Sequence, residues 1–263
     1  MTTTGASYIQ VTEEQIYQAI ADVLDPELDE SLVKLGFIDR VEVNGPDVSI
    51  TFKLPTFWCA PNFAYLMAAD LRKRAGLVPG VRNVRVILLD HCAEDEVTNG
   101  INQGRSFAEA FPGESTEDEH LEELRRIFLR KGFLMRQDTL LRQMLKLGLD
   151  EATIAALRVA DIRIDEPANT AFVTAHGREY PLERAGRSGH LYQQRRVALD
   201  LPHAETDPLI IDDQGQPLQT GGLQQFLRRS RSVRMNIMFN TSMCKGLFHT
   251  RYGGPSVPDD DDL

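Results

Sequence analysis

The chain has 263 residues, of which 42% are hydrophobic and 26% are charged, a composition typical of a soluble globular protein. This length predicts two modest domains, each able to bury a core without disulfides. No apolar run approaches the roughly 18 residues of a membrane-spanning helix, and residues 1–10 lack the basic and apolar regions of a secretory signal.

Cysteine content and charge indicate the cellular compartment of the protein and the class of its binding partners. Three cysteines do not make a disulfide framework, which favours a reducing cytoplasm where a cysteine stays a thiol. The formal net charge is −10, and residues 1–115 carry 17 acidic and 9 basic side chains. Nucleic-acid binding by this part is therefore disfavoured, because it depends on Lys and Arg. The acidic run at 259–262 predicts a solvated, disordered end.

The first part of the chain predicts the order helix, strand, strand, helix, strand. Thr12 and Gln15 form a capping box for the first helix, and Asp25-Pro26 ends it. The first two strands alternate apolar and polar residues around an Asn44-Gly45-Pro46-Asp47 turn, which indicates a β-hairpin. The last strand is mostly apolar, which indicates a buried strand. The predicted ranges are 12–24, 37–43, 48–54, 62–75 and 82–89.

The rest of the chain predicts a second, mainly helical domain with one hairpin. Helices are expected at 118–132, 136–147, 151–158 and 221–230, and a hairpin at 169–182 turns at His176-Gly177. The fold class is thus α/β (α+β), a small α-β-β-α-β domain followed by a helical and β-hairpin accessory domain. The predicted boundaries are 1–105 for the first domain, 106–118 for a linker, 119–252 for the accessory domain and 253–263 for an acidic tail.

Chemistry-bearing residues follow two strands of the first domain. The strands at 48–54 and 82–89 flank a helix and form a βαβ unit, so in one sheet they are parallel and end at the same edge. In open α/β sheets, ligands bind at this carboxyl edge. The loop after the first strand carries Cys59, and the loop after the second carries Asp90, His91, Cys92 and Glu94.

Cys59 is the central candidate, because it lies just before a predicted helix. Free N–H groups and the helix dipole favour a thiolate there, and a thiolate binds iron or zinc. Trp58 could shield the site. A small buried hydrophobe remains the alternative for Cys59. Cys92 and His91 are possible further ligands, although they are adjacent and neighbouring strand-end residues point opposite ways. Asp25 and Glu27 read as a solvated helix end rather than an acid/base pair.

The ordered pieces at residues 11–95 resemble the small metal–sulfur cluster assembly factors related to SufT and PaaD. The pieces are Asp25-Pro26-Glu27-Leu28, Leu35-Gly36-Phe37-Ile38, a hairpin, a cysteine before a helix, and the segment Val78-Pro79-Gly80-Val81-Arg82-Asn83-Val84. The resemblance implies a compact α/β domain that matures iron–sulfur proteins. It also implies Cys59 as the functional cysteine, with iron or an iron–sulfur cluster held transiently, and Asp25 and Glu27 as the acidic positions.

Departures from that family point to a specialised factor. The family often has Gly-Cys-Pro, whereas this chain has Trp58-Cys59-Ala60-Pro61, and about 150 residues follow the domain. Relatives of this domain are similar to proteins encoded beside multicomponent oxygenases, so the resemblance implies an oxygenase with iron–sulfur or di-iron centres as a client by analogy. No turnover chemistry is required, so the chain is not expected to be an enzyme.

The sequence leaves open whether the protein forms a homodimer. The rival readings are a metal-free protein-interaction scaffold or client chaperone, and a DNA-binding recombinase relic.

Residues 148–226 faintly resemble part of the tyrosine recombinase catalytic domain. The pieces are Gly148-Leu149, the segment Ala156-Leu157-Arg158-Val159-Ala160-Asp161-Ile162, the hairpin with Arg178-Glu179-Tyr180-Pro181-Leu182, and Gly215-Gln216-Pro217-Leu218, with Arg251-Tyr252 near the end. That chemistry needs clustered arginines, and Asp150 stands where the first belongs. The resemblance therefore implies an inactive domain, and ordinary helix and hairpin packing is the alternative.

The segment from Gln224 to Arg251 combines six basic residues with methionines and other apolar side chains, and it contains no acid. Such a surface suits an adaptable protein interface, and completion of the core is the equal alternative. Cys244 is expected to be structural, unless this segment folds back onto the Cys59 site.

Overall fold

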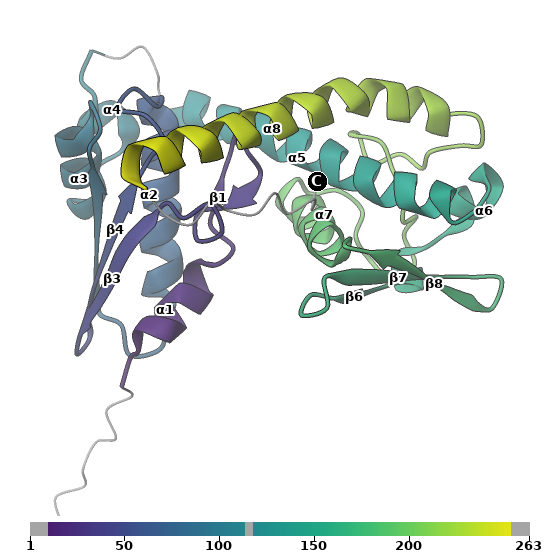
Figure 1. The fold of residues 1–263 in the computed structure, drawn as a ribbon, viewed down its shortest axis with the longest axis horizontal. Coiled ribbons are helices and arrows are strands. Elements are labelled where there is room, and N and C mark those ends of the chain that lie inside the picture. The colour runs from purple at the N-terminus through teal and green to yellow at the C-terminus, as the bar shows by residue number, and fades with distance from the viewer. Residues whose placement is uncertain (1–9, 114–117, 254–263) are drawn as a thin grey trace, which may run out of the picture. The chain divides into compact units, whose positions relative to one another are not determined.

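The computed structural model describes residues 10–113 and 118–253 (Figure 1). The described residues form two compact units, one of residues 10–113 and 118–124 with 241–253, and the other of Arg125–Asn240. This division differs from the predicted boundaries, because the C-terminal residues from Thr241 belong to the first unit. The predicted acidic tail, 253–263, lies outside the described residues apart from Gly253.

The first unit has the predicted α-β-β-α-β order with additional short elements. Its helices and strands are α1 (Glu13–Ile20), β1 (Leu24–Asp25), β2 (Glu30–Ser31), β3 (Ile38–Asn44), β4 (Asp47–Lys53), α2 (Pro61–Gly76), β5 (Asn83–Leu89), α3 (Glu94–Asn102) and α4 (Phe107–Ala110). The capping box is confirmed. The Thr12 hydroxyl accepts from the backbone N–H of Gln15 at 3.3 Å, and the side-chain oxygen of Gln15 accepts from the backbone N–H of Thr12 at 3.0 Å. The helices and strands of the chain confirm the predicted α/β fold class.

The central sheet has the order β3-β4-β5. The predicted hairpin joins β3 and β4, and β5 pairs with β4 in parallel, in unbroken register from Asp47 with Asn83 to Lys53 with Leu89. Apolar side chains of β4 and β5 fill a core against α2, because alternate strand residues point to one face. β5 is an edge strand, only alternately buried, rather than the fully buried strand that its apolar sequence predicted.

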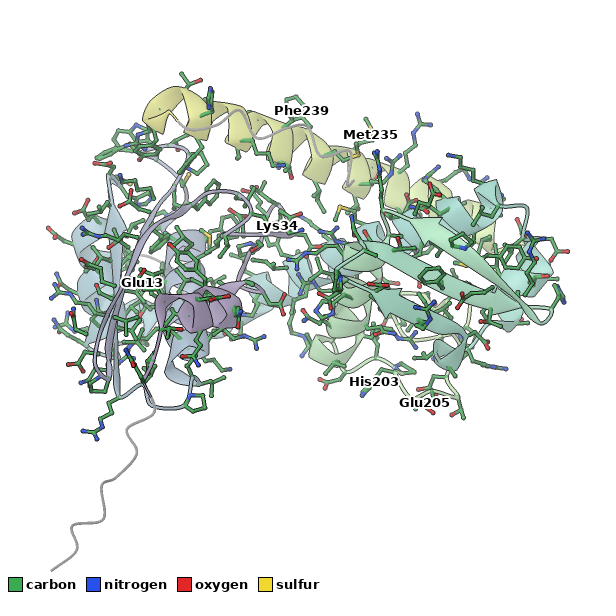
Figure 2. All side chains as sticks on the ribbon, turned by 60° about the horizontal axis from the view of Figure 1, so that its bottom comes forward. Glu13, Lys34, His203, Glu205, Met235 and Phe239 are labelled. Carbon is green, nitrogen blue, oxygen red and sulfur yellow. The ribbon has the colours of Figure 1, made fainter. Side chains whose placement is uncertain are left out.

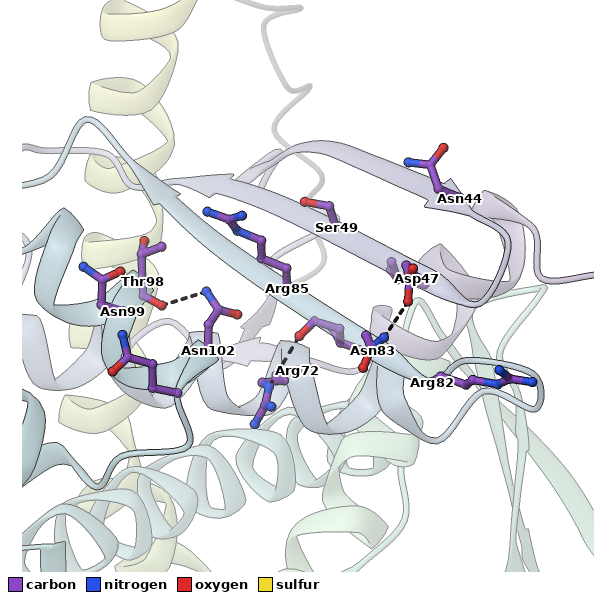
Figure 3. Close-up of a pocket in the computed structure, with 13 residues that line it drawn as sticks. Asn44, Asp47, Ser49, Arg72, Arg82, Asn83, Arg85, Thr98, Asn99 and Asn102 are labelled. Atoms are coloured by element: carbon purple, nitrogen blue, oxygen red, sulfur yellow. Dashed lines mark hydrogen bonds between the residues drawn. The ribbon is translucent and has the colours of Figure 1, made fainter.

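Side chains of α3 close the free edge of β5 (Figure 3). The side-chain oxygen of Asn102 accepts from the Val86 N–H at 2.9 Å, and its side-chain nitrogen donates to the Val86 carbonyl at 2.7 Å. The Thr98 hydroxyl accepts from the Leu88 N–H at 3.1 Å. An exposed edge strand invites pairing with another chain, and these bonds occupy the groups that such pairing needs.

The stretch predicted as a linker at 106–118 is partly core. Ser106 starts α4 with a capping box to Glu109, and Phe107 and Phe111 are buried. The two phenyl rings stack with centroids 4.6 Å apart, and Phe107 meets the Tyr65 ring edge to face at 5.4 Å. The Gly, Ser and Pro content suggested a linker, but the two phenylalanines bury enough apolar surface to fix the segment.

Replacing Gly100 by alanine tests the packing of α3 against α4. A Cβ at Gly100 would lie 2.7 Å from the Ala110 Cβ and 3.2 Å from the Tyr65 ring, both shorter than normal contacts. Relieving this overlap is expected to lower the free energy of unfolding by about 1–3 kcal/mol. Urea unfolding measures the change. Gly104→Ala is no suitable control, because its φ of 68° is itself strained for alanine. Ala108→Gly, at an exposed position of α4, should change stability by less than about 1 kcal/mol.

The second unit combines a three-stranded sheet with helices. Its helices and strands are most of α5 (Asp118–Lys146), α6 (Glu151–Ala156), η1 (Val159–Asp161), β6 (Ile162–Asp165), β7 (Thr170–Ala175), β8 (Arg178–Glu183), α7 (Gly186–Ala198) and the first part of α8 (Leu223–Tyr252). The predicted hairpin is β7–β8, and β6 adds a third strand. The two helices predicted at 118–132 and 136–147 are one, because Phe133 and Met135 in the expected break are buried like their helical neighbours.

A buried carboxylate joins α5 to α8 within the second unit. Asp138 is fully buried, and the Ser230 hydroxyl donates to it at 2.6 Å. Arg142 donates twice, at 2.6 and 3.2 Å, and the Arg234 guanidinium forms an ion pair at 3.0 Å. Two cations and a hydroxyl thus compensate the charge, which burial requires.

Helix α8 continues from the predicted 221–230 helix through the residues that the sequence left open. The sequence predicted that the apolar side chains of this segment form an interface or complete the core. Ile237 is buried in the structure, whereas other apolar side chains of α8 are exposed. The exposed ones are Met235, Phe239, Met243 and Leu247. Figure 2 shows Met235 and Phe239 projecting from the helix. No helix in the part of the chain that the structure describes is long and apolar enough to cross a membrane.

Candidate functional site

The predicted strand ends meet as expected at one edge of the first unit. β4 and β5 are parallel and in register, so the loops that leave them are neighbours. The Cys92 N–H donates to the Phe57 carbonyl at 2.9 Å, and the His91 ring bonds the Cys59 carbonyl at 2.7 Å. These two bonds join the loop that carries Cys59 to the loop that carries His91 and Cys92.

His91 holds the Cys59 backbone in place. Its Nδ1 accepts from the Ala93 N–H at 3.1 Å, so Nε2 carries the proton that it donates to the Cys59 carbonyl. Burial lowers the pKa of the imidazole, which keeps the ring neutral. Neither nitrogen therefore offers a free lone pair, and binding of metal by His91 would require breaking these contacts. The geometry gives His91 a positioning role rather than the ligand role predicted from the sequence.

The two predicted thiol ligands have different surroundings. Cys59 is half-buried against the core, one residue before Ala60, the N-cap of α2, as predicted. Its sulfur lies 3.3 Å from the Thr56 hydroxyl. Cys92 is exposed. No group of three or more His, Cys, Asp or Glu side chains within residues 10–113 and 118–253 is arranged to hold a metal ion. A metal or cluster at Cys59 would thus take several of its ligands from elsewhere.

Trp58 differs from its predicted role as a shield. Its side chain is 77% exposed, and it meets Phe57, itself 43% exposed, edge to face at 4.9 Å. The Trp58 N–H donates to the Thr56 hydroxyl at 3.2 Å, which fixes the backbone of this loop. Two exposed aromatic rings beside the thiol are suited to contact with another protein.

Asp25 is the last residue of β1 and Glu27 lies in the turn that leads to β2, whereas α1 ends earlier, at Ile20. The prediction of a solvated helix end is wrong for Asp25, because its side chain is buried. The carboxylate accepts from the N–H groups of Glu27 at 2.8 Å and Leu28 at 3.1 Å. Burial raises the pKa of Asp25 to about 6, in spite of those two bonds.

The end of α8 packs over the same strand ends. Phe248 contacts Phe37 with ring centroids 5.0 Å apart, and Tyr252 lies against Phe248 at 4.8 Å. The Arg251 guanidinium donates to the Asp90 carbonyl at 2.7 Å and to the Leu54 carbonyl at 3.5 Å. Leu54 follows β4 and Asp90 follows β5, so Arg251 fixes the helix at the carboxyl edge. Sequence reasoning considered Arg251 as a recombinase residue and as part of the basic segment from Gln224, and Tyr252 as a recombinase residue, without placing either at this edge.

The segment that contains Asp25 and Cys59 matches the sequence model of a protein family. Residues 13–86 match the sequence model of the iron-sulfur cluster assembly protein family. The match confirms the predicted resemblance and indicates a role in iron–sulfur cluster assembly. No curated protein matches the chain. The recombinase resemblance of residues 148–226 stays a prediction.

The limits of the match divide the site residues into two groups. The assembly-protein segment contains Asp25 and Cys59, but it ends within β5, before His91 and Cys92, and far before Cys244. Cys244 is half-buried against the same core as Cys59. The end of α8 packs on the assembly-protein segment through Phe248 and Phe37, and the role of Cys244 stays a prediction.

A polar pocket of about 480 Å³ lies at the opposite ends of the same strands (Figure 3). Arg72, Arg82 and Arg85 line it, together with Asp47 and Asn83, whose side chains bond each other at 2.6 Å. The pocket contains none of the predicted site residues. The candidate site is therefore the Cys59 edge rather than this pocket.

Proposed function

We propose that this chain is a cytoplasmic iron–sulfur assembly or maturation factor that holds its cargo at Cys59 and passes it to a client metalloprotein. The observation that carries the proposal is the position of Cys59. It lies in the family-matched segment, at a strand edge where a second loop and its own helix fix the backbone, with its sulfur only half-buried.

The surroundings of Cys59 suit temporary holding. A closed structural metal site uses four protein ligands, and the described side chains do not assemble such a set. Iron or a cluster at Cys59 would therefore keep positions open for ligands of the client, which is what release requires. The chain would catalyse no reaction in this role, and the metal or cluster is cargo.

The second unit would dock the client. Its part of α8 exposes Met235 and Phe239, and Arg228, Arg229 and Arg231 are exposed on the same helix. Methionine, aromatic and arginine side chains are enriched in adaptable protein interfaces. A multicomponent oxygenase with iron–sulfur or di-iron centres is the proposed client, by analogy with the family resemblance.

Anaerobic reconstitution with iron and sulfide tests the function. The wild-type protein is expected to retain iron and acid-labile sulfide after desalting, and Cys59→Ala to retain at most a tenth as much. Cys92→Ala, at the exposed thiol of the neighbouring loop, is the matched control and should retain most of the cargo. Equal metal content in wild type and Cys59→Ala would instead support a metal-free scaffold, for which the exposed Phe57 and Trp58 rings would serve as the docking surface.

A further inference from the structure

The two edges of the central sheet differ in how their backbone groups are bonded. β5 forms one edge, and the side chains of Asn102 and Thr98 bond the backbone groups that face away from the sheet. β3 forms the other edge, and among the described strands it pairs with β4 alone. An edge strand without such a cover is a template for pairing with another chain. The edge of β3 can therefore accept a further strand.

The register of the β3–β4 hairpin shows which backbone groups face this edge. Asn44 and Asp47 flank the two-residue turn, so they form a hydrogen-bonded pair, and bonded and non-bonded pairs then alternate along β3. Glu42 therefore bonds β4, whereas the N–H and carbonyl groups of Val41 and Val43 point away from it. No hydrogen bond to these outward groups occurs within residues 10–113 and 118–253. Donors and acceptors at this edge are thus available to a partner strand.

The side chains along the edge carry opposite charges. Arg40 and Glu42 lie on the same face of β3, 3.5 Å apart, with 60% and 47% of their side chains exposed. Val41, between them, points into the core. The irregularity in the β3–β4 register lies before Arg40, so the strand is regular from Arg40 to Asn44. A cation on one side of Val41 and an anion on the other make this stretch complementary to an antiparallel copy of itself.

We propose that β3 pairs with β3 of a second copy of this chain, antiparallel and centred on Val41, so that the two central sheets join into one. A contact about a two-fold axis must be self-complementary, and this stretch meets that condition. With the two Val41 residues opposite each other, their N–H and carbonyl groups exchange hydrogen bonds. Each Arg40 then lies opposite Glu42 of the second copy, and directly opposite pairs of unlike charge stabilise paired strands.

Charge selects this register over its neighbours. The next register in one direction that keeps the outward backbone groups facing each other would place the two Glu42 side chains opposite each other. The next one in the other direction would do the same with the two Arg40 side chains. Like charges directly opposite destabilise paired strands. The registers between these would set outward groups of one strand against groups that already bond β4 in the other.

Charge reversal on β3 tests the interface, and sedimentation velocity of the full-length protein measures it. The wild-type protein is expected to be dimeric at roughly 100 μM. Arg40→Glu and Glu42→Arg each create like-charge pairs on both sides of the two-fold axis, so each should raise the dissociation constant of the dimer at least about tenfold. Arg85→Glu, at an exposed residue of β5 in the same sheet, is the matched control and should leave the dimer unchanged.

Mixing the two variants separates pairing from a loss of folding. In an equimolar mixture of Arg40→Glu and Glu42→Arg chains, every directly opposite charge pair across the interface is unlike, so a heterodimer should form. The double variant Arg40→Glu/Glu42→Arg should likewise form a homodimer. A monomeric wild type would overturn the proposal, as would a dimer that both single variants form equally well, or a mixture that associates no better than its components. These variants leave the Cys59 edge unchanged, so the result is independent of the proposed function.

Discussion

The Asp25→Asn variant is expected to be more stable than the wild-type protein at neutral pH, by up to about 3 kcal/mol. Burial raises the pKa of the Asp25 carboxyl from 3.8 to about 6, so ionisation above that pH opposes folding. Asparagine keeps the oxygen that accepts from the Glu27 and Leu28 N–H groups and removes the charge. An ionised carboxylate retained at this cost is consistent with a role in function.

The sign of the pH dependence follows from proton binding. Between about pH 4 and pH 6 the folded wild-type protein binds more protons at Asp25 than the unfolded chain, so its stability falls as pH rises through this range. Urea unfolding at roughly pH 4 and pH 7 should show the two proteins alike at the lower pH and different at the higher one. Asp95→Asn, at an exposed carboxylate of α3, is the matched control substitution. Parallel profiles for Asp25→Asn and wild type would contradict the account.

The Asp138→Ala variant is expected to lose about 3–5 kcal/mol of the free energy of unfolding. The Asp138 carboxylate is fully buried and compensates Arg142 and Arg234, and it also accepts from Ser230. Alanine would leave the mostly buried guanidinium of Arg234 without its ion-pair partner. The neighbouring Arg142 is also a cation and cannot replace the lost carboxylate. Breaking a buried ion pair from one side is costly for this reason.

An exposed ion pair in the same unit serves as the control that distinguishes the effect of burial from the effect of losing a charge. Arg163 and Glu179 lie 3.1 Å apart on the sheet of the same unit, and about half of each side chain is exposed. Glu179→Ala should therefore change stability by less than about 1 kcal/mol. Urea unfolding followed by far-ultraviolet circular dichroism measures both variants. Similar effects for Asp138→Ala and Glu179→Ala would contradict the compensating role of the buried carboxylate.

Local sequence signals predicted the central βαβ unit and both hairpins. Thr12 with Gln15, the turn at Asn44-Gly45, and Pro79-Gly80 mark element ends whatever packs around them. The signals failed where tertiary contacts decide. The predicted linker at 106–118 contains α4 because Phe107 and Phe111 bury their rings. Helix α5 passes through its expected break because Phe133 packs inside the second unit.

The candidate site was predictable in its position and less so in its chemistry. Parallel strand register brings the loops of Cys59 and His91 together, and that follows from the order of elements. Burial of Asp25 and the two backbone bonds of His91 depend on contacts that no spacing encodes. The packing of the end of α8 on this edge, through Phe248 and Arg251, also depends on tertiary contacts that the sequence does not show.

Cluster transfer tests the central claim most directly. The protein, loaded anaerobically with an iron–sulfur cluster and desalted, is mixed with an apo-ferredoxin in the presence of an iron chelator. The wild-type protein is expected to convert the acceptor to its holo form, because cargo bound at Cys59 passes on without becoming free iron. Cys59→Ala should convert no more acceptor than the buffer does. If both proteins convert the acceptor equally, or neither does so although the wild type carries cluster, Cys59 is not the point from which cargo is handed on.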